Sequence, residues 1–441
     1  MSPYHPTLDS FDGPAFDNHN LIRAQLGLSA NWNVTSKVIS DVRKYADDCK
    51  EESFTVVDNG RTTPRREKGT TLIRIEAGQS LHKRCPICRR KARVKDHVVR
   101  TLRHVDDLGS TCYLEVTLPK FKCPSCGGTP QLPFPLAREY VSFTRAFEEE
   151  VIRTLMEEDK ASTALKLGTT ASIVTDIVNF HVNNAYSKIN LKKMRILFVD
   201  EIQFGRGHDY VTVFSNKDRR MVFMTEGKNH ETIDAFAEFL VERGGKKEKI
   251  RAVSADMSPA FESGVKANFR NAKLVWDRFH LVQAVNKALD DVRKRTSNSG
   301  EKLGKIKYTV LYSAENLPEK HWDRMEKIRL HNPELALAYD MKEAFCAILK
   351  IQDGRKARAA LNRWFKWVLE EGCPEFVKRA SIYQQNIGYI VSWFKFRISN
   401  GVAEGINSVL KKIKSQACGY SNLVSYRNMC LLRIGAIRVT I

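Results

Sequence analysis

Two pairs of closely spaced cysteines restrict the fold of this chain more than any other feature. Cys85 and Cys88 form one Cys-x-x-Cys pair, and Cys123 and Cys126 form the other. Four thiolates in a tetrahedral array are the usual ligands of a structural Zn²⁺ site, which is closed and has no catalytic task. The gap between the pairs is wider than in a compact zinc ribbon, so residues 94–118 are expected to fold out as a β excursion. The sequence therefore predicts a zinc ribbon that carries this excursion.

The residues near the cysteine pairs include alternative zinc ligands, and they suggest what the ribbon does. His97, His104 and Cys112 lie inside the excursion and could replace a cysteine as ligands. The ribbon would hold nearby basic side chains against DNA phosphates. These side chains are Arg89, Arg90, Lys91 and Arg93.

The charge of the chain indicates a polyanionic partner. The 441 residues include 72 Lys and Arg against 51 Asp and Glu, a formal net charge of +21. Residues 61–103 hold 14 Lys or Arg against 3 Asp or Glu, and Glu404 is the only carboxylate of residues 376–441. Such an excess favours nucleic acid, with an affinity that falls as salt rises. In the second basic region, the predicted phosphate contacts come from Lys411, Lys412 and Lys414.

Cysteine usage and hydropathy predict where the protein works. Ten cysteines are too few for a secreted disulfide scaffold, which favours a reducing cytoplasm. The N-terminus has no basic and then apolar signal segment, and no window approaches the roughly 18 apolar residues of a membrane span. We therefore expect a cytoplasmic protein without membrane contact.

Changes of pattern divide the chain into six parts. Pro130, Pro133 and Pro135 mark the end of the cysteine-bearing segment. Helical periodicity starts near residue 142, and apolar strand patterns start at Met194. The predicted parts are a small β-containing region (1–80), the zinc ribbon (81–130), a helix-turn-helix (140–188), the first part of an α/β core (194–296), a helical insertion (297–385) and the completion of the core (386–441).

The third part has the spacing of a DNA-binding helix-turn-helix. A break at Gly168 precedes a helix expected at 171–185, with Ile173, Ile177, Phe180 and Val182 facing inward. The second helix of such a motif can enter the major groove. An ordinary helical hairpin has the same spacing, so both interpretations stay open.

The order of elements after Met194 predicts the fold class. Three strands, a helix, a strand, a helix, a strand and a helix follow one another, which is the order of an RNase H-like sheet. The strands are expected at 194–199, 210–214, 221–225, 250–254 and 273–279. We therefore expect a multidomain α/β protein whose RNase H-like mixed sheet is interrupted by a helical insertion and preceded by the ribbon and the helix-turn-helix.

Three carboxylates at the ends of elements could share divalent metal ions. Asp200 and Asp256 each end an apolar strand, and in a parallel pairing these ends lie side by side. Glu404 would come from a helix, expected at 399–414, that packs across them. Glu201 is an alternative ligand to Asp200.

Two further pairs of residues have both a functional and a structural interpretation. Asp277 and His280 close the strand expected at 273–279 and could orient a ligand or contact a phosphate, but a structural histidine has the same spacing. Trp364 and Trp367 of the insertion could stack on an unpaired base. A role in a helical core is favoured for both tryptophans.

Several strings of residues together resemble the ISL-three family of bacterial insertion-sequence transposases. They are VDEI at 199–202, HDYVTV at 208–213, SADMSPAF at 254–261, DRFH at 277–280, ISNGVAEGIN at 398–407 and GYSN at 419–422. The resemblance extends back through the helix-turn-helix and the ribbon to Leu26 and Trp32, so it covers nearly the whole chain.

This resemblance implies a DDE-type DNA transposase of the bacterial nucleoid. The catalytic Asp, Asp, Glu triad of the family maps onto Asp200, Asp256 and Glu404, which would hold two Mg²⁺ or Mn²⁺ ions, and Asp277 and His280 belong to the neighbourhood of that site. The resemblance implies hydrolysis of double-stranded DNA at the terminal inverted repeats and strand transfer into target DNA. Because two ends are cut together, a homodimer or a larger homo-oligomer is expected.

Two other functions fit parts of the sequence. A domesticated or inactive DNA-binding regulator would use the ribbon and the helix-turn-helix alone, but it would not need three acids at these positions. A structure-selective RNase H-like nuclease would cut DNA without joining it, and nothing in the residues excludes this. A tyrosine recombinase is disfavoured, because no Arg and His cluster accompanies an isolated tyrosine.

Overall fold

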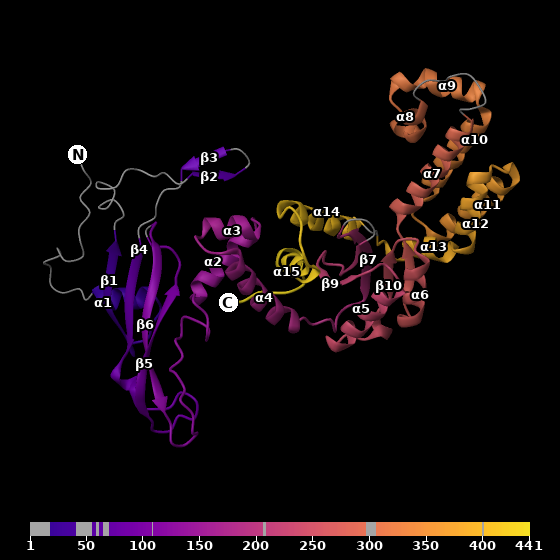
Figure 1. Ribbon diagram of the computed structural model, residues 1–441. Helices are drawn as coiled ribbons and strands as arrows, with labels where there is room; N and C mark the ends of the chain where they lie inside the picture. Colours follow the sequence, from indigo (N-terminus) through magenta and orange to yellow (C-terminus); the bar gives the residue numbers. More distant parts are fainter. Residues whose placement is uncertain are drawn as a thin grey trace. The chain divides into compact units, whose positions relative to one another are not determined.

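The computed structural model describes residues 18–40, 55–58, 61–64, 70–107, 109–205, 209–296, 306–398 and 401–441 (Figure 1). These residues form two compact units, one that ends at Val178 and one that runs from Asn179 to Thr440. Each unit has its own sheet and its own buried core.

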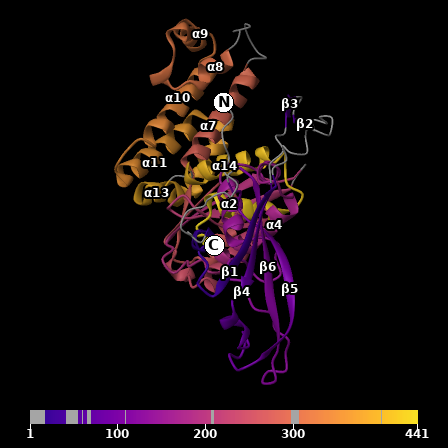
Figure 2. The ribbon, with the colours of Figure 1, turned by 90° about the vertical axis from the view of Figure 1, so that its left-hand side faces the viewer.

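The N-terminal unit is built on a four-stranded sheet with the order β1-β4-β6-β5, which Figure 2 shows side by side. β5 and β6 form a long antiparallel hairpin, and β4 pairs with β6 in parallel. Every second residue of β6 from Cys112 to Leu118 is buried, because successive side chains of a strand point to opposite faces. The hairpin confirms the predicted β excursion. The elements are α1 (Asn18–Gln25), β1 (Trp32–Ser40), β4 (Thr70–Ala77), β5 (Arg93–Arg103) and β6 (Thr111–Lys122), with β2 (Thr55–Asp58) and β3 (Arg61–Pro64) as a separate antiparallel pair.

The boundary predicted at residue 80 falls between β4 and β5, although both strands belong to this one sheet. β1, which the sequence did not predict, pairs with β4, and Trp32 at its start is buried against Phe134 with ring centroids 5.1 Å apart. Within the small β-containing region predicted for residues 1–80, β2 begins at Thr55, and residues 53 and 54 lie outside the described part. The same is true of residues 1–17 and 41–52 of the predicted N-terminal region.

Three helices complete this part of the chain: α2 (Arg145–Leu155), α3 (Lys160–Lys166) and α4 (Ala171–Ser187). Asp159 caps α3 by accepting the N–H groups of Ala161 and Ser162, and Gly168 adopts the left-handed conformation (φ 61°) that turns the chain towards α4. The predicted inward face of α4 is wrong at Phe180, which is 44% exposed. The buried stripe has the period of a helix but a different phase, and it consists of Val174, Ile177, Val178, His181 and Val182.

The second unit contains a five-stranded mixed sheet with the order β11-β10-β7-β8-β9. β7, β10 and β11 are parallel, whereas β8 and β9 are antiparallel to their neighbours. This order confirms the predicted RNase H-like sheet. The elements are β7 (Ile196–Gln203), β8 (Tyr210–Ser215), β9 (Met221–Glu226), α5 (His230–Glu242), β10 (Ala252–Ala255), α6 (Pro259–Asn268) and β11 (Lys273–Trp276).

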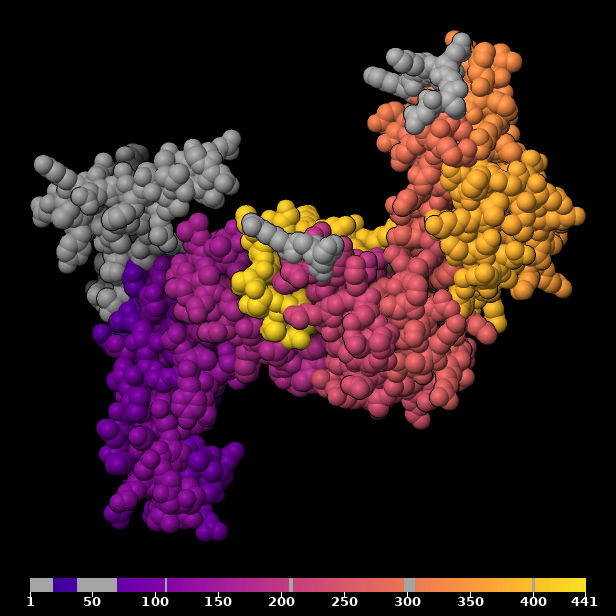
Figure 3. All heavy atoms as spheres, turned by 45° about the vertical axis from the view of Figure 1, so that its right-hand side comes forward, coloured from indigo at the N-terminus to yellow at the C-terminus, as the bar shows by residue number. Residues whose placement is uncertain are grey.

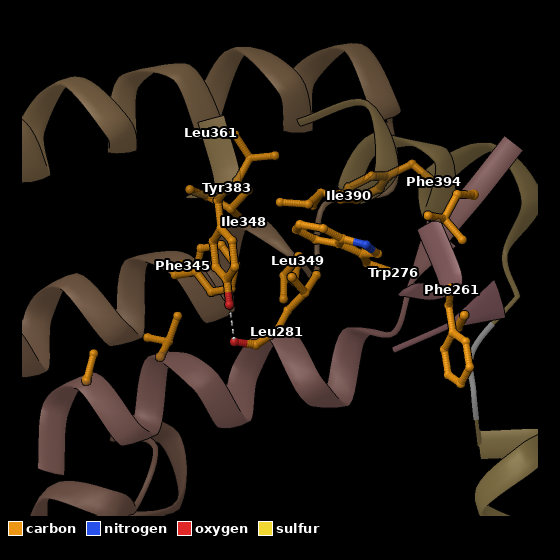
Figure 4. Packing of buried hydrophobic residues seen from close by; sticks show 14 of the residues in the cluster. Phe261, Trp276, Leu281, Phe345, Ile348, Leu349, Leu361, Tyr383, Ile390 and Phe394 are labelled. Carbon is orange, nitrogen blue, oxygen red and sulfur yellow. Dashed lines mark hydrogen bonds between the residues drawn. The ribbon is translucent and has the colours of Figure 1, made fainter. Parts of the chain in front are cut away.

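A helical bundle interrupts this fold between β11 and the C-terminal helices. Trp364 is buried and its Nε1–H donates to the carbonyl of Met341 (2.9 Å), which confirms a core role for this tryptophan. Tyr383 donates its hydroxyl to the carbonyl of Leu281, a contact that joins two helices of the bundle (Figure 4). None of the helices in the described part is long and apolar enough to span a membrane. The helices are α7 (Arg278–Thr296), α8 (Ile306–Leu311), α9 (Trp322–His331), α10 (Pro333–Ile348), α11 (Gly354–Glu371), α12 (Pro374–Gln385) and α13 (Ile387–Phe396).

Two C-terminal helices return to the sheet. α14 (Gly401–Gln416) packs against β7, and α15 (Leu423–Ile434) packs against β9. Figure 3 shows these C-terminal residues in yellow beside the rose-coloured residues of the sheet region. The helix expected at 399–414 corresponds to α14, and its residues 399 and 400 lie outside the described part.

Candidate functional site

Three aspartates lie in or directly after neighbouring parallel strands of the second unit. Asp200 lies in β7, and Asp256 and Asp277 come directly after β10 and β11. The register pairs Ser254 with Phe198, and continuing it by two residues sets Asp256 beside Asp200. On its other side, β10 is in register with β11, so that Asp256 also lies opposite Asp277. The parallel pairing thus brings together the two strand ends that the sequence placed side by side.

The aspartates point to the face of the sheet that α14 covers. Phe198 clusters with Ala403 of α14, whereas Leu197 belongs to the core on the opposite face, beneath α5 and α6. Because side chains alternate along a strand, Asp200 shares the face of Phe198 and Glu201 points to the other face. The alternation therefore separates two adjacent carboxylates that the sequence alone could not distinguish.

His280 lies between two of the aspartates. Its Nδ1 is 2.7 Å from Asp256 Oδ1 and 3.0 Å from Asp277 Oδ2. The close contacts of its ring with the carboxylates of Asp256 and then of Asp277 raise the pKa of His280 to about 10, which favours the imidazolium form at neutral pH. The strand predicted through residue 279 ends earlier, at Trp276, and α7 begins at Arg278. The reason is local, since the Asp277 carboxylate accepts the N–H of His280 (3.3 Å) and so stabilises the first turn of a helix.

Asp200 is oriented by two hydrogen bonds. Its Oδ1 accepts the N–H of Glu201 (2.9 Å), and its Oδ2 accepts a hydrogen bond from Nδ2 of Asn407 on α14 (2.8 Å). Burial, followed by repulsion from Asp256, raises the pKa of the Asp200 carboxyl to about 7. Asn407 is a site residue that the sequence analysis did not single out. Its position three residues after Glu404, on the same helix face, was the available signal.

Glu404 lies on the same face of α14 as Asn407. Three residues of helix correspond to about 4.5 Å along the axis, so α14 places Glu404 about one turn from the residue that contacts Asp200. Glu404 Oε1 and Asn407 Oδ1 are both buried and accept no hydrogen bond from the described residues. Unpaired oxygens beside carboxylates are the ligands that Mg²⁺ and Mn²⁺ prefer. The residues present therefore fit a divalent metal centre.

The four paired cysteines lie together in the N-terminal unit. Cys85 Sγ is 3.8 Å from Cys126 Sγ, and Cys88 Sγ is 3.5 Å from Cys123 Sγ. Zn–S bonds of about 2.3 Å in a tetrahedron require sulfur atoms about 3.8 Å apart, so these four thiols fit a zinc ion. Backbone N–H groups, foremost that of Cys126, lower the pKa of Cys123 to about 6, so Cys123 is the thiol of this cluster that ionises most readily.

The alternative zinc ligands take no part in this cluster. Cys112 is buried in the core of the sheet, where burial raises the pKa of its thiol to about 11. His104 Nδ1 lies 2.8 Å from the hydroxyl of Thr144, and burial lowers its pKa to about 4. His97 is exposed, and its ring lies 5.7 Å from that of His82.

The candidate phosphate-binding residues are accessible. The four basic residues of the ribbon, Arg89, Arg90, Lys91 and Arg93, are all exposed. On α14, Lys411 and Lys412 are exposed, whereas Lys414 is half-buried and its Nζ donates to the carbonyl of Gln203 (3.3 Å) at the end of β7. Lys411 follows Glu404 by seven residues, or two helical turns, so it extends the same stripe of α14.

Comparisons with known proteins match both regions. A family model of the ISL3 group, described as a transposase, matches residues 197–430, and a model described as the zinc-finger of transposase IS204/IS1001/IS1096/IS1165 matches residues 82–126. The transposase for insertion sequence element IS1557 of Mycobacterium tuberculosis is 24% identical over 457 residues, covering 96% of this chain and 97% of the relative. The transposase for insertion sequence element IS1001 of Bordetella parapertussis is 23% identical over 373 residues, covering 82% and 89%. A chain from the simian T-cell lymphotropic virus intasome in complex with PP2A regulatory subunit B56 gamma is 14% identical, with a TM-score of 0.16, and the match covers 43% of this chain and 66% of that chain.

Proposed function

Because the chain belongs to the ISL3 family of transposases, we propose that it cuts DNA at the terminal inverted repeats of an insertion sequence and joins the freed ends to target DNA. The proposed catalytic residues are Asp200, Asp256 and Glu404. The observation that carries the proposal is the parallel register of β7 and β10, which sets the two aspartates side by side beneath the helix of Glu404.

In the proposed mechanism, the three carboxylates hold two divalent ions, and the neighbouring side chains hold the carboxylates. Mg²⁺ or Mn²⁺, when bound, would activate a water molecule or a 3′-OH and stabilise the leaving oxygen. Asn407 fixes one oxygen of Asp200, so that this carboxylate keeps its orientation towards α14. His280, held in turn by Asp277, positions the carboxylate of Asp256.

DNA recognition is proposed to use three surfaces. α4 of the helix-turn-helix would read the inverted repeats in the major groove. The exposed cations of the zinc ribbon would contact phosphates, and Lys411, Lys412 and Lys414 would hold the backbone next to the cut. A homodimer or a larger homo-oligomer would act on the two ends together at the nucleoid of the bacterial cytoplasm.

A cleavage and joining assay tests the proposed function. The full-length protein is incubated with Mg²⁺, a labelled duplex that carries the terminal repeat of its own element, and a supercoiled target plasmid. We expect 3′-OH ends at the repeat boundary and covalent joints between repeat and plasmid. Cleavage without joints would identify a nuclease instead, and tight binding without cleavage in Mg²⁺ or Mn²⁺ would identify a regulator, so either result contradicts the proposal.

Asn407→Ala should slow DNA cleavage by about 10- to 100-fold. The change removes the hydrogen bond to Asp200 but keeps every proposed metal-binding carboxylate, and a hydrogen bond to a charged group contributes about 1.5 to 3 kcal/mol. Rates at saturating DNA should be measured across a Mg²⁺ titration, in which a misoriented Asp200 raises the Mg²⁺ concentration needed for half-maximal rate. Ser415→Ala, at an exposed position of the same helix, is the matched control and should cut like the parent. An Asn407→Ala protein with the parent rate and Mg²⁺ dependence would show that Asp200 does not need this residue.

A further inference from the structure

We propose that the exposed face of α11 binds the phosphates of DNA next to the active site. This inference rests on the proposed function, because it assigns a surface to the DNA of that reaction, and it gives the helical insertion a role. We call this surface the α11 basic face. It consists of Arg355, Lys356, Arg358, Arg363 and Lys366.

α11 separates apolar and cationic residues between its two sides. Its buried side includes Leu361, Trp364 and Phe365, whereas all five cations are exposed. From Arg355 to Lys366 the helix rises by about 16 Å, which matches about four or five phosphates of one DNA strand. Between the capping Asp353 and Glu370, α11 contains no acidic residue. The α11 basic face is therefore cationic over its whole length.

Several cations on the other helices of the bundle form ion pairs with carboxylates. The ion pairs include Arg295 with Glu334 and Glu375, Arg329 with Asp340, and Lys350 with Glu315. On the α11 basic face, only Lys366 has such a partner among the described residues, at 3.6 Å from Glu370. Soluble surfaces usually intersperse charges of both signs. The unpaired cations of α11 thus indicate a partner that supplies the negative charge.

The α11 basic face begins where the insertion returns to the active-site sheet. Gly354 approaches α13 so closely that an added Cβ would lie 3.1 Å from Cβ of Phe394. Arg397, just after α13, donates a hydrogen bond to the carbonyl of Gln352, which precedes α11. Ile398 then packs into the apolar cluster on the sheet face that bears the aspartates. Figure 4 shows Phe394 of α13 in the same packed region as Leu361 of α11. DNA that leaves the active site along α13 would therefore meet Arg397 and then the α11 basic face.

The chemistry of this face favours DNA over a protein partner. The core of a protein interface is depleted of charge and rich in apolar and aromatic side chains. Leu369 is the only large apolar residue of α11 that is substantially exposed, and it lies beyond Lys366. An acid-free row of guanidinium and ammonium groups instead complements a phosphate backbone.

The test is the salt dependence of DNA binding by a triple variant, Arg355→Gln with Arg358→Gln and Arg363→Gln, in the full-length protein. Fluorescence anisotropy is measured between about 50 and 200 mM NaCl on a labelled duplex that carries the terminal repeat and flanking DNA. Ca²⁺ replaces Mg²⁺ so that binding is measured without relying on cleavage. Each lost phosphate contact lowers the slope of log affinity against log salt by about 0.9, so we expect a slope shallower by about 2 to 3.

A second triple variant controls for the loss of charge. Lys217→Gln, Arg219→Gln and Arg220→Gln remove three exposed cations from the β8–β9 turn, at the end of the sheet remote from Asp200. This variant should keep the parent slope. An equal loss of slope in both variants, or none in the α11 variant, would overturn the inference. The inference would also be overturned if the α11 variant bound DNA like the parent but had a different oligomeric state by light scattering. That result would assign the α11 basic face to a contact between copies of the chain.

The outcome is independent of whether the protein cuts DNA. A parent protein that binds through the α11 basic face but makes no cuts in Mg²⁺ or Mn²⁺ would contradict the proposed function and keep this inference. If the parent protein cuts and joins DNA but the α11 variant binds DNA like the parent, the proposed function is supported and this inference is contradicted.

Discussion

Asp256→Asn should abolish DNA cleavage while DNA binding stays at the parent level. The change keeps the size of the side chain and removes the negative charge that a divalent ion needs, a loss of several kcal/mol in transition-state stabilisation, or at least about 1,000-fold in rate. The cations proposed to bind DNA lie elsewhere and are unchanged. Asp200→Asn and Glu404→Gln should behave in the same way. Cleavage is measured on the labelled repeat duplex with Mg²⁺, and binding is measured separately with Ca²⁺.

Two carboxylates outside the proposed triad serve as controls. Glu201→Gln is the more stringent control, because Glu201 follows Asp200 in β7 and, by the alternation of side chains along a strand, belongs to the other face of the sheet. Asp218→Asn removes an exposed charge in the β8–β9 turn. Both variants should retain cleavage. If Glu201→Gln lost cleavage and Asp200→Asn kept it, the two residues would exchange roles, and cleavage retained in all three triad variants would contradict the triad.

The neighbourhood of Asp200 and Asp256 could be predicted from the sequence because it depends on simple patterns. An apolar run that ends in an acid marks a buried strand with its functional end, and parallel strands bring their carboxyl ends to one edge. The spacing of the cysteine pairs was equally informative, because a metal site requires all four thiols at one point. Both features can be predicted because each needs only a local sequence pattern and one general rule, either the alignment of parallel strand ends or the gathering of four thiols at a metal.

Contacts between distant elements could not be predicted in this way. Asn407 and Asp200 are 207 positions apart, and the hydrogen bond between them depends on how α14 crosses the sheet. Asp277 was expected on a strand, but its side chain stabilises a helix start that strand propensity does not reveal. Phe180 faces solvent because tertiary packing chose a different phase of the α4 stripe, and periodicity fixes the period of a buried stripe better than its phase.

Cys85→Ser combined with Cys123→Ser should release zinc and loosen the ribbon, while the rest of the N-terminal sheet stays folded. The ribbon has a small apolar core of its own, in which the buried residues are Cys85, Ala92, Phe121 and Cys123. Structural zinc contributes an apparent binding free energy of about 10 to 16 kcal/mol in small metal domains, far more than such a core supplies. Zinc content by mass spectrometry should fall from about one ion per chain to near zero. Limited digestion with trypsin should become faster after the exposed basic residues that follow Cys88.

The sheet next to the ribbon has a separate core, which makes the expected damage local. Ile75, Leu114 and Val116 pack in that core without contributing to the ribbon cluster, so proteolytic protection of β4 and the middle of β6 should persist. Cys112→Ala is the matched control, because Cys112 is a buried cysteine of this second core and should leave the zinc content unchanged. Loss of zinc in Cys112→Ala would make it a ligand, and absence of zinc from the parent protein would refute the site. Because the ribbon carries four of the proposed phosphate-binding cations, the double variant should also bind the repeat duplex with a shallower salt dependence than Cys112→Ala.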